Sequence, residues 1–371
     1  LAGRVHPVFG IIFTFIVYLS IGPLMAIPRT GTVTFEMGVL PFLNEEMKQS
    51  WVPLFITTIV FFAITYWLAL TPSKMVDRIG KILTPALLAI IAIMYIATLF
   101  NPIGEIGEPT AAYVQSSFIK GFLEGYLTLD ALAAMVFGIV VTASVKSMGV
   151  TEPRSIMWST IKAAVIAAIG LGLVYLALGY MGATSYSLGQ SDNGGQILTS
   201  VVQFLFGSIG SAILGAAVIL ACLTTSVGLV TACGRFFSEN ISGISYRGMV
   251  TILSVFSAAV ANVGLTQLIA YSVPILMMIY PVAIVLMLLS FLHKVFKGYS
   301  SVYVGAIVFT AAISLIDGAA MLGLPVEGIT KIYSMLPLHG QGVGWIFPAL
   351  AGGLIGFLWG SFRATPEVAG E

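Results

Sequence analysis

Charged residues are scarce in this sequence. Only 8% of its 371 residues are Asp, Glu, Lys or Arg, whereas 58% are hydrophobic. Soluble domains carry about 25% charged residues, so this composition, with a mean hydropathy of +1.03, predicts an integral membrane protein. A net charge of +1 leaves no basic face of the kind that nucleic-acid binding requires.

Cysteine and histidine are also rare. Cys222 and Cys233 lie in one apolar run, where a helix would separate them by about 16 Å, too far for a disulfide. The histidines are His6, His293 and His339, all near predicted ends or loops. The sequence holds no HExxH, no GxSxG and no paired aspartates of a metal-dependent transferase. It therefore predicts neither an enzyme nor a bound cofactor.

Long apolar runs, by contrast, follow one another along the chain. A helix that crosses a bilayer needs about 20 mostly apolar residues, and ten candidate runs can be counted. We therefore expect an all-α, polytopic membrane bundle of about ten transmembrane helices, in one domain without a soluble module. The runs lie near residues 8–26, 51–70, 84–100, 127–145, 158–179, 209–232, 249–262, 267–292, 302–316 and 343–361.

Lysine and arginine are divided unevenly between the two sides of such a bundle. If all ten runs cross the membrane, twelve of the sixteen fall on one side. Because Lys and Arg accumulate in cytoplasmic loops, that side, with Leu1 and the C-terminus, is predicted to be cytoplasmic. The twelve are Arg4, Lys74, Arg78, Lys81, Lys146, Arg154, Lys162, Arg235, Arg247, Lys294, Lys297 and Arg363.

The run at 127–145 is too short for a straight transmembrane helix, because only fifteen uncharged residues separate Asp130 from Lys146. A break would explain this, and half-helix ends can receive the charged ends of a zwitterion. The midplane lies about ten residues above Lys146, so the break is predicted at Ala133–Gly138. Its small and aliphatic side chains suit an aliphatic amino acid. The candidate substrate-binding residues are Ala133, Ala134, Met135, Phe137 and Gly138.

Two polar residues are further substrate-site candidates. Asp130 would lie a few ångströms inside the outer membrane boundary, and an intramembrane carboxylate is a functional candidate. Alternatively, it faces a water-filled vestibule or caps a helix end. Tyr18 should lie near the midplane, fourteen residues beyond Arg4. Its hydroxyl needs a partner there, which could be another helix or a bound ligand.

Hydroxyl side chains gather in the run at 209–232, where Thr224, Thr225 and Ser226 are consecutive. Thr225 lies ten residues above Arg235, or about 15 Å, which is near the midplane. Hydroxyl oxygens and a freed carbonyl, such as that of Ala221, are hard ligands suited to an alkali cation. Alternatively, these hydroxyls bond back to carbonyls of their own helix.

Several stretches together resemble the branched-chain amino acid:cation symporter family of bacteria. They are "IGPLMAIPRTGTVTFEMGV" (21–39), "GYLTLDALAAMVFGIVV" (125–141), "ACLTTSVGLVTAC" (221–233) and "NVGLTQLIAYSVPILMMIYP" (262–281). In the first, Arg29 and Glu36 lie seven residues apart and could pair along the outer end of the helix.

The resemblance implies a fold like that of LeuT, with five-plus-five inverted repeats and usually twelve helices. The first two helices would then be missing from this chain. Residues 1–120 would hold helices three to five, 121–292 helices six to ten, and 293–371 two accessory helices. By position, the broken sixth helix corresponds to Ala133–Gly138, the sodium site to Ala221, Thr224 and Thr225, and a third-helix tyrosine loosely to Tyr18.

The resemblance also implies a function. We expect sodium-coupled symport of leucine, isoleucine and valine into the cell, across the plasma membrane of a bacterium. Proton-coupled transport of these or other neutral amino acids is the alternative, with Asp130 as the residue to suspect. A passive pore would favour a line of polar residues through the bundle, whereas the polar sites here are clustered.

Overall fold

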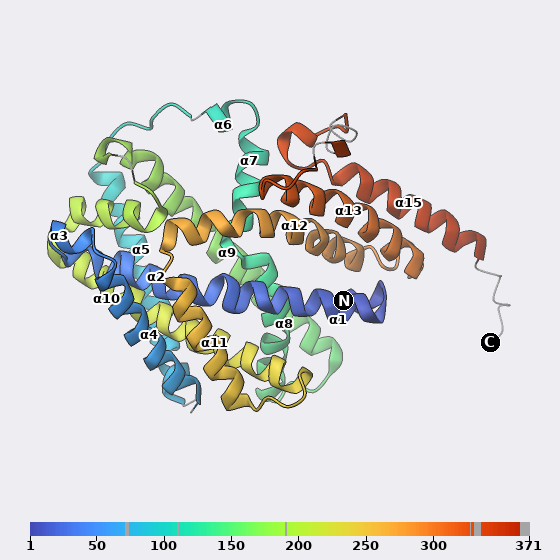
Figure 1. Ribbon diagram of the computed structural model, residues 1–371, viewed down its shortest axis with the longest axis horizontal. Helices are drawn as coiled ribbons and strands as arrows, with labels where there is room; N and C mark the ends of the chain where they lie inside the picture. Colours follow the sequence, from blue (N-terminus) through green and yellow to red (C-terminus); the bar gives the residue numbers. More distant parts are fainter. Residues whose placement is uncertain (71–73, 110, 190, 327, 330–334, 364–371) are drawn as a thin grey trace. The chain divides into compact units, whose positions relative to one another are not determined.

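The computed structural model describes residues 1–70, 74–109, 111–189, 191–326, 328–329 and 335–363, and its regular structure there is entirely helical (Figure 1). The longer helices are α1 (Pro7–Leu19), α2 (Ala26–Gly38), α4 (Val52–Leu70), α5 (Lys74–Phe100), α7 (Ser117–Glu124), α8 (Asp130–Ser147), α9 (Pro153–Thr184), α10 (Gly194–Asn240), α11 (Tyr246–Ala261), α12 (Leu265–Phe291), α13 (Ser300–Met321) and α15 (Ile346–Arg363). The short elements are η1 (Ala2–Arg4), η2 (Ser20–Leu24), η3 (Leu40–Phe42), α3 (Glu45–Lys48), α6 (Ala111–Val114), η4 (Gly125–Thr128), η5 (Ser185–Leu188) and η6 (His339–Gln341).

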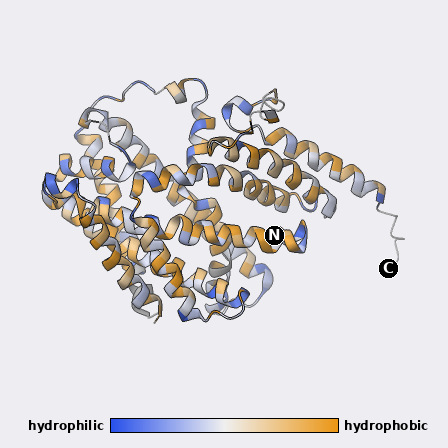
Figure 2. Cartoon of the chain, viewed as in Figure 1, coloured by the Kyte–Doolittle hydropathy of each residue, from blue (hydrophilic) through white to orange (hydrophobic). Residues whose placement is uncertain are grey.

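Nine helical segments within the described ranges are long and apolar enough to cross a membrane, and α11 is a shorter apolar helix. Each of the ten predicted runs coincides with one of these ten segments. Hydrophobic residues dominate the bodies of the helices, as Figure 2 shows by colour. The polytopic helical membrane fold is therefore confirmed.

The chain divides into two compact units. The first comprises Leu1–Tyr18, Pro109–Val136 and Ile269–Glu371, and the second comprises Leu19–Glu108 and Phe137–Leu268. Three of the four boundaries fall inside α1, α8 and α12, and the fourth lies between α5 and α6. The predicted division into 1–120, 121–292 and 293–371 rests on the inverted-repeat resemblance and stays a prediction.

In the first unit, α13 and α15 pack side by side through glycine (Figure 1). A Cβ atom built on Gly305 would lie 2.2 Å from the carbonyl oxygen of Gly352, and one on Gly356 would lie 2.2 Å from that of Ser301. The hydroxyl of Ser301 donates a 2.6 Å hydrogen bond to the Gly356 carbonyl. Lipid tails are as apolar as the helices, so the hydrophobic effect does not drive helices together inside a membrane. They associate instead through close backbone packing of this kind.

The second unit is built around α2, α4, α10 and α11. Its core cluster includes Ile27, Phe62, Val230 and Val250. Helix α10 lies so close to α2 that a Cβ on Gly215 would come within 2.9 Å of the Met37 carbonyl oxygen. Within α10 the helix is kinked at Gly207, which has a positive φ of 63°, a conformation that glycine adopts without steric cost.

Candidate functional site

The structure of the run at 127–145 differs from its prediction. Helix α8 runs without interruption from Asp130 to Ser147, so the prediction of a break at Ala133–Gly138 was wrong. The chain is interrupted instead at Leu129, whose φ of 64° and ψ of 5° are left-handed. A break four residues earlier still separates α7 and the 3-10 turn η4 from α8.

Hydrogen bonds around Leu129 hold this interruption in place. Its N–H donates to the Tyr126 carbonyl at 3.2 Å, and its carbonyl accepts from the N–H of Ala133 at 2.9 Å. The Thr128 hydroxyl donates to the Gly125 carbonyl at 2.8 Å and accepts from the N–H of Asp130 at 3.4 Å. The Leu129 carbonyl is thus the first hydrogen-bond acceptor of α8. The amides in the first turn of α8 lack intrahelical acceptors and face the interruption.

Buried aromatic side chains line the chain just before Leu129. Tyr126 stacks on Tyr280 of α12 with ring centroids 4.4 Å apart and an interplanar angle of 17°, and both are buried. Burial raises the pKa of the Tyr126 phenol, an effect that the indole of Trp345 partly offsets. The phenol therefore stays protonated and able to donate. This pair was not predicted from the sequence, although each tyrosine interrupts an apolar stretch, in "GYLTLD" and "MIYP".

The predicted substrate-site residues fall in both units. Tyr18, Asp130, Ala133, Ala134 and Met135 belong to the first unit. Asp130 is the first residue of α8 and is half-buried, as is Tyr18. Of the three α8 residues in this group, Ala134 is exposed and the other two are half-buried.

Phe137 and Gly138 belong to the second unit. Phe137 packs against the core cluster of that unit, whereas Gly138 is exposed and a Cβ there would meet open space. Within the first unit, the structure therefore gathers the α8 residues from Asp130 to Met135 just beyond the interruption at Leu129.

The predicted cation-site residues lie on α10 but do not share one face. The Thr224 hydroxyl donates a 2.9 Å hydrogen bond to the Ala221 carbonyl, which is the helix back-bonding that the sequence left open. Thr225 is exposed. Ser226 is completely buried, and its hydroxyl has no hydrogen-bond partner among the described residues. Because successive helical residues are turned by about 100°, Ser226 points about 140° away from Ala221.

A second backbone interruption lies in the second unit, between α1 and α2. In the π-helical turn η2, Gly22 has non-helical angles (φ −95°, ψ −122°) and Pro23 follows it. Ser20, Ile21, Gly22 and Pro23 are all buried, and a Cβ on Gly22 would lie 2.9 Å from the Sγ atom of Cys233. The sequence signal was the Gly-Pro pair, because proline removes an amide donor and glycine permits the bend.

The pairing of Glu36 with Arg29 stays a prediction. The carboxylate of Glu36 accepts from Asn193 at 3.3 Å and from Gln196 at 3.4 Å. Residues seven apart in a helix are separated by about 10.5 Å along the axis, whereas the start of α10 lies beside Glu36. Asn193 also caps α10 through its side-chain oxygen.

Comparison with known proteins gives a consistent result. The family described as "Branched-chain amino acid transport protein" matches residues 1–363. The "Branched-chain amino acid permease BrnQ" of Bacillus subtilis is 50% identical over 365 residues, which cover 98% of this chain and 82% of that protein. For the "Branched-chain amino acid permease BraB" of the same organism, the identity is 49% over 360 residues, 96% of this chain and 80% of the relative.

A more distant relative extends this similarity to another bacterium. The "Branched-chain amino acid transport system 2 carrier protein" of Pseudomonas aeruginosa is 44% identical over 340 residues. These cover 91% of this chain and 76% of the relative.

Proposed function

The chain belongs to the family of branched-chain amino acid transport proteins, and from this we propose that it carries leucine, isoleucine and valine into a bacterial cell by symport with sodium. It is a transport protein and not an enzyme, in agreement with the sequence analysis. The relatives' names support the substrate class. The lysine and arginine distribution of this chain supports cytoplasmic termini and a plasma-membrane location. The motifs of the chain support a LeuT-like inverted repeat.

The observation that carries the substrate proposal is the left-handed Leu129 immediately before α8. Helix N-termini offer N–H groups and a positive dipole end to an anion. We therefore assign the substrate carboxylate to the first turn of α8 and its ammonium group to Asp130. Ala133 follows on the same helix and provides apolar surface for an aliphatic side chain. Ala134, Met135, Phe137, Gly138 and Tyr18 stay predicted members of the site.

The sodium proposal is supported by the chemistry of α10. The Thr224 hydroxyl already donates its hydrogen bond to the Ala221 carbonyl. The lone pairs of the hydroxyl oxygen are therefore free to coordinate a cation. Thr225 is exposed and able to coordinate, whereas the unpartnered, buried hydroxyl of Ser226 would complete a site only after a rotation of the helix. Alkali cations are held by such neutral oxygens where they must be released again.

Uptake of labelled leucine into proteoliposomes tests the proposal. With an inward sodium gradient, leucine should accumulate above its external concentration, and replacing sodium by choline should abolish this accumulation. Thr225→Ala should raise the sodium concentration needed for half-maximal uptake several-fold and leave competition by isoleucine and valine unchanged. Thr160→Ala is the matched control, because the Thr160 hydroxyl back-bonds to the Ile156 carbonyl in α9, outside the proposed sites, and should have no effect.

The half-buried carboxylate of Asp130 favours proton coupling as the alternative. In that case an inward proton gradient alone would drive leucine accumulation, and Asp130→Asn would abolish it. Equal uptake with sodium and with choline would overturn the sodium proposal. Leucine that only equilibrates across the membrane, whatever the gradient, would indicate a passive pore.

A further inference from the structure

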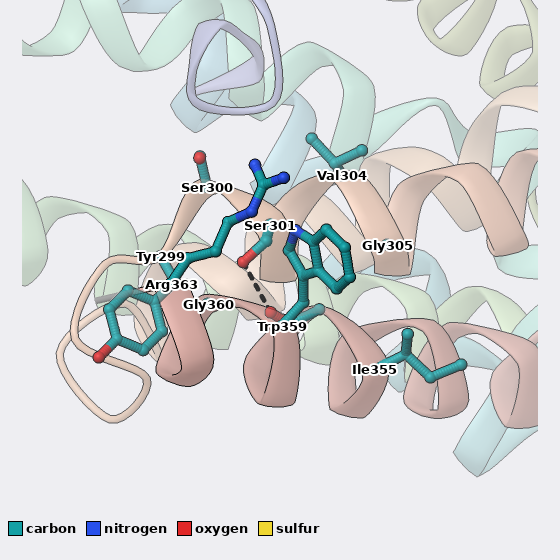
Figure 3. Close-up of a pocket in the computed structure, with 10 residues that line it drawn as sticks. Tyr299, Ser300, Ser301, Val304, Gly305, Ile355, Trp359, Gly360 and Arg363 are labelled. Carbon is teal, nitrogen blue, oxygen red and sulfur yellow. Dashed lines mark hydrogen bonds between the residues drawn. The ribbon is translucent and has the colours of Figure 1, made fainter. Parts of the chain in front are cut away.

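A groove of about 610 Å³ lies between α13 and α15 in the first unit, away from Leu129 in the chain and unused by the transport proposal. Figure 3 shows its lining. Its floor exists because Gly305, Gly356 and Gly360 carry no side chains. A Cβ on Gly360 would lie 2.7 Å from the Ser301 hydroxyl and 2.8 Å from the Tyr299 ring.

The groove changes from apolar to polar along its length. Val304 and Ile355 provide aliphatic surface toward one end, and Tyr299 and Ser300 provide hydroxyl groups toward the other (Figure 3). Ser300 and Val304 are exposed, and Ile355 is 55% exposed, so the groove opens on the outside of the helix pair. A ligand that fits it must itself have an apolar and a polar part.

The polar end carries a positive charge. The guanidinium of Arg363 lies over the indole of Trp359, with its carbon 4.7 Å from the ring centroid, and extends from α15 toward α13 (Figure 3). Stacking on an aromatic face leaves the edge of the guanidinium open, so its N–H donors can reach a ligand.

Further basic residues lie on the segments that meet at this end of the first unit. Lys294 and Lys297 are exposed in the connection between α12 and α13, and Arg4 donates a 3.2 Å hydrogen bond to Tyr303 of α13. No Asp or Glu occurs within residues 1–19, 286–308 or 350–363. Within these three ranges every charged residue is therefore basic, whereas Glu367 and Glu371 follow Arg363 in the sequence.

We propose that this groove binds an anionic phospholipid, with its phosphate at Arg363 and Ser300 and an acyl chain along Val304 and Ile355. Arg363 provides the planar donors that phosphate oxygens accept bidentately. Basic pockets between transmembrane helices are suited to anionic headgroups. A free anion would leave the aliphatic half of the groove empty, and the excess of positive charge disfavours a second copy of the same surface.

Thermal unfolding of the purified intact chain in mild detergent tests the proposal. Dioleoyl-phosphatidylglycerol should raise the melting temperature more than dioleoyl-phosphatidylcholine, and inorganic phosphate should not reproduce the rise. Arg363→Glu should weaken the apparent affinity for phosphatidylglycerol at least about fivefold, since one basic residue near an anionic lipid contributes about that factor. Arg154→Glu, a charge reversal at an exposed arginine of α9, is the matched control and should retain the wild-type affinity.

Fluorescence locates the lipid independently of stability. Phosphatidylglycerol with brominated acyl chains should quench the wild-type protein more than a Trp359→Phe variant, whereas brominated phosphatidylcholine should quench both equally. Equal responses to the two lipids, a full response to phosphate alone, or an unchanged affinity in Arg363→Glu would overturn the proposal. So would a change from dimer to monomer in Arg363→Glu by light scattering, because the groove would then be an interface between copies.

Discussion

The two backbone interruptions, at Gly22–Pro23 and at Leu129, are held open by different means. At the first, the residue types themselves interrupt the helix: proline has no amide proton, and glycine leaves the space that Cys233 occupies. At the second, a leucine adopts left-handed angles, which cost an L-residue with a Cβ atom about 1–2 kcal/mol. Its side chain is only 6% exposed, so packing must offset this cost.

The two interruptions differ in what they imply about function. An interruption at Gly and Pro follows from the residue types themselves, because glycine permits the bend and proline lacks the amide donor. An interruption that persists against the backbone preference of its residue is over-determined by its surroundings, and such positions concentrate at binding sites. The comparison therefore favours Leu129 over Gly22 as the site of substrate contact.

The largest expected effect is at Leu129. Leu129→Ala and Leu129→Gly both remove a buried side chain, at a cost of about 2–5 kcal/mol. The glycine variant should be the more stable of the two by about 1 kcal/mol, because glycine adopts positive φ without strain. The measurement is the melting temperature of each variant in detergent.

The control is a glycine substitution within a regular helix, where the effect on stability should have the opposite sign. Ala134→Gly, an exposed position inside α8, should lower stability by about 1 kcal/mol, as glycine does in helices. If Leu129→Ala were more stable than Leu129→Gly, the left-handed conformation would not be a determinant of the fold, and the comparison would fail.

An intermediate effect is expected at Gly22. Gly22→Ala places a Cβ 2.9 Å from the Cys233 sulfur and should destabilise the protein by about 1–3 kcal/mol, as overpacking does. Adding Cys233→Ala removes the sulfur and leaves the Cβ of residue 233 at 3.7 Å, an ordinary contact. The double variant should therefore recover most of the loss in a double-mutant cycle, and additive losses would contradict the steric explanation.

The smallest effect concerns α7, which precedes Leu129. Lys120 and Glu124 form a half-exposed ion pair one turn apart, so Glu124→Gln should cost no more than about 0.5 kcal/mol. The hydrogen bond to Glu124 raises the pKa of Lys120 above its ordinary 10.5. The pair therefore stabilises the protein at neutral pH, and this contribution is lost as the pH rises through the raised pKa of Lys120.

Salt provides a check on this last prediction, since 1 M salt shortens the Debye length to about 3 Å. The wild type and Glu124→Gln should then have the same melting temperature. A difference that persists in high salt would mean that Glu124 supports the interruption by packing and not by charge.

The membrane fold could be predicted from the sequence because hydrophobic run length alone determines it. The exact interruption could not be, because Leu129 differs from any other leucine only in its surroundings. Counting residues from Lys146 predicted a break between Asp130 and Lys146, whereas the helix is continuous there. The actual break lies one residue before the charge, where the first turn of α8 includes Asp130.

The candidate cation site was likewise predictable only in part. The sequence showed three adjacent hydroxyl residues on α10. It did not show which of them would be exposed and which buried, because consecutive helical positions point in different directions. Only the packing of α10 determines that Thr225 is exposed and Ser226 is enclosed. The Tyr126–Tyr280 stack joins residues 154 positions apart, a contact that no local pattern encodes.

The backbone contact between α13 and α15 has a practical consequence for spectroscopy. With carbonyl oxygens of one helix facing glycines of the other, no layer of side chains is left between them that could repack and let the two slide. Labels at the exposed positions Val308 and Leu354 would thus keep a fixed separation throughout a transport cycle. The separation of these two labels can serve as a fixed reference for distances that change during transport.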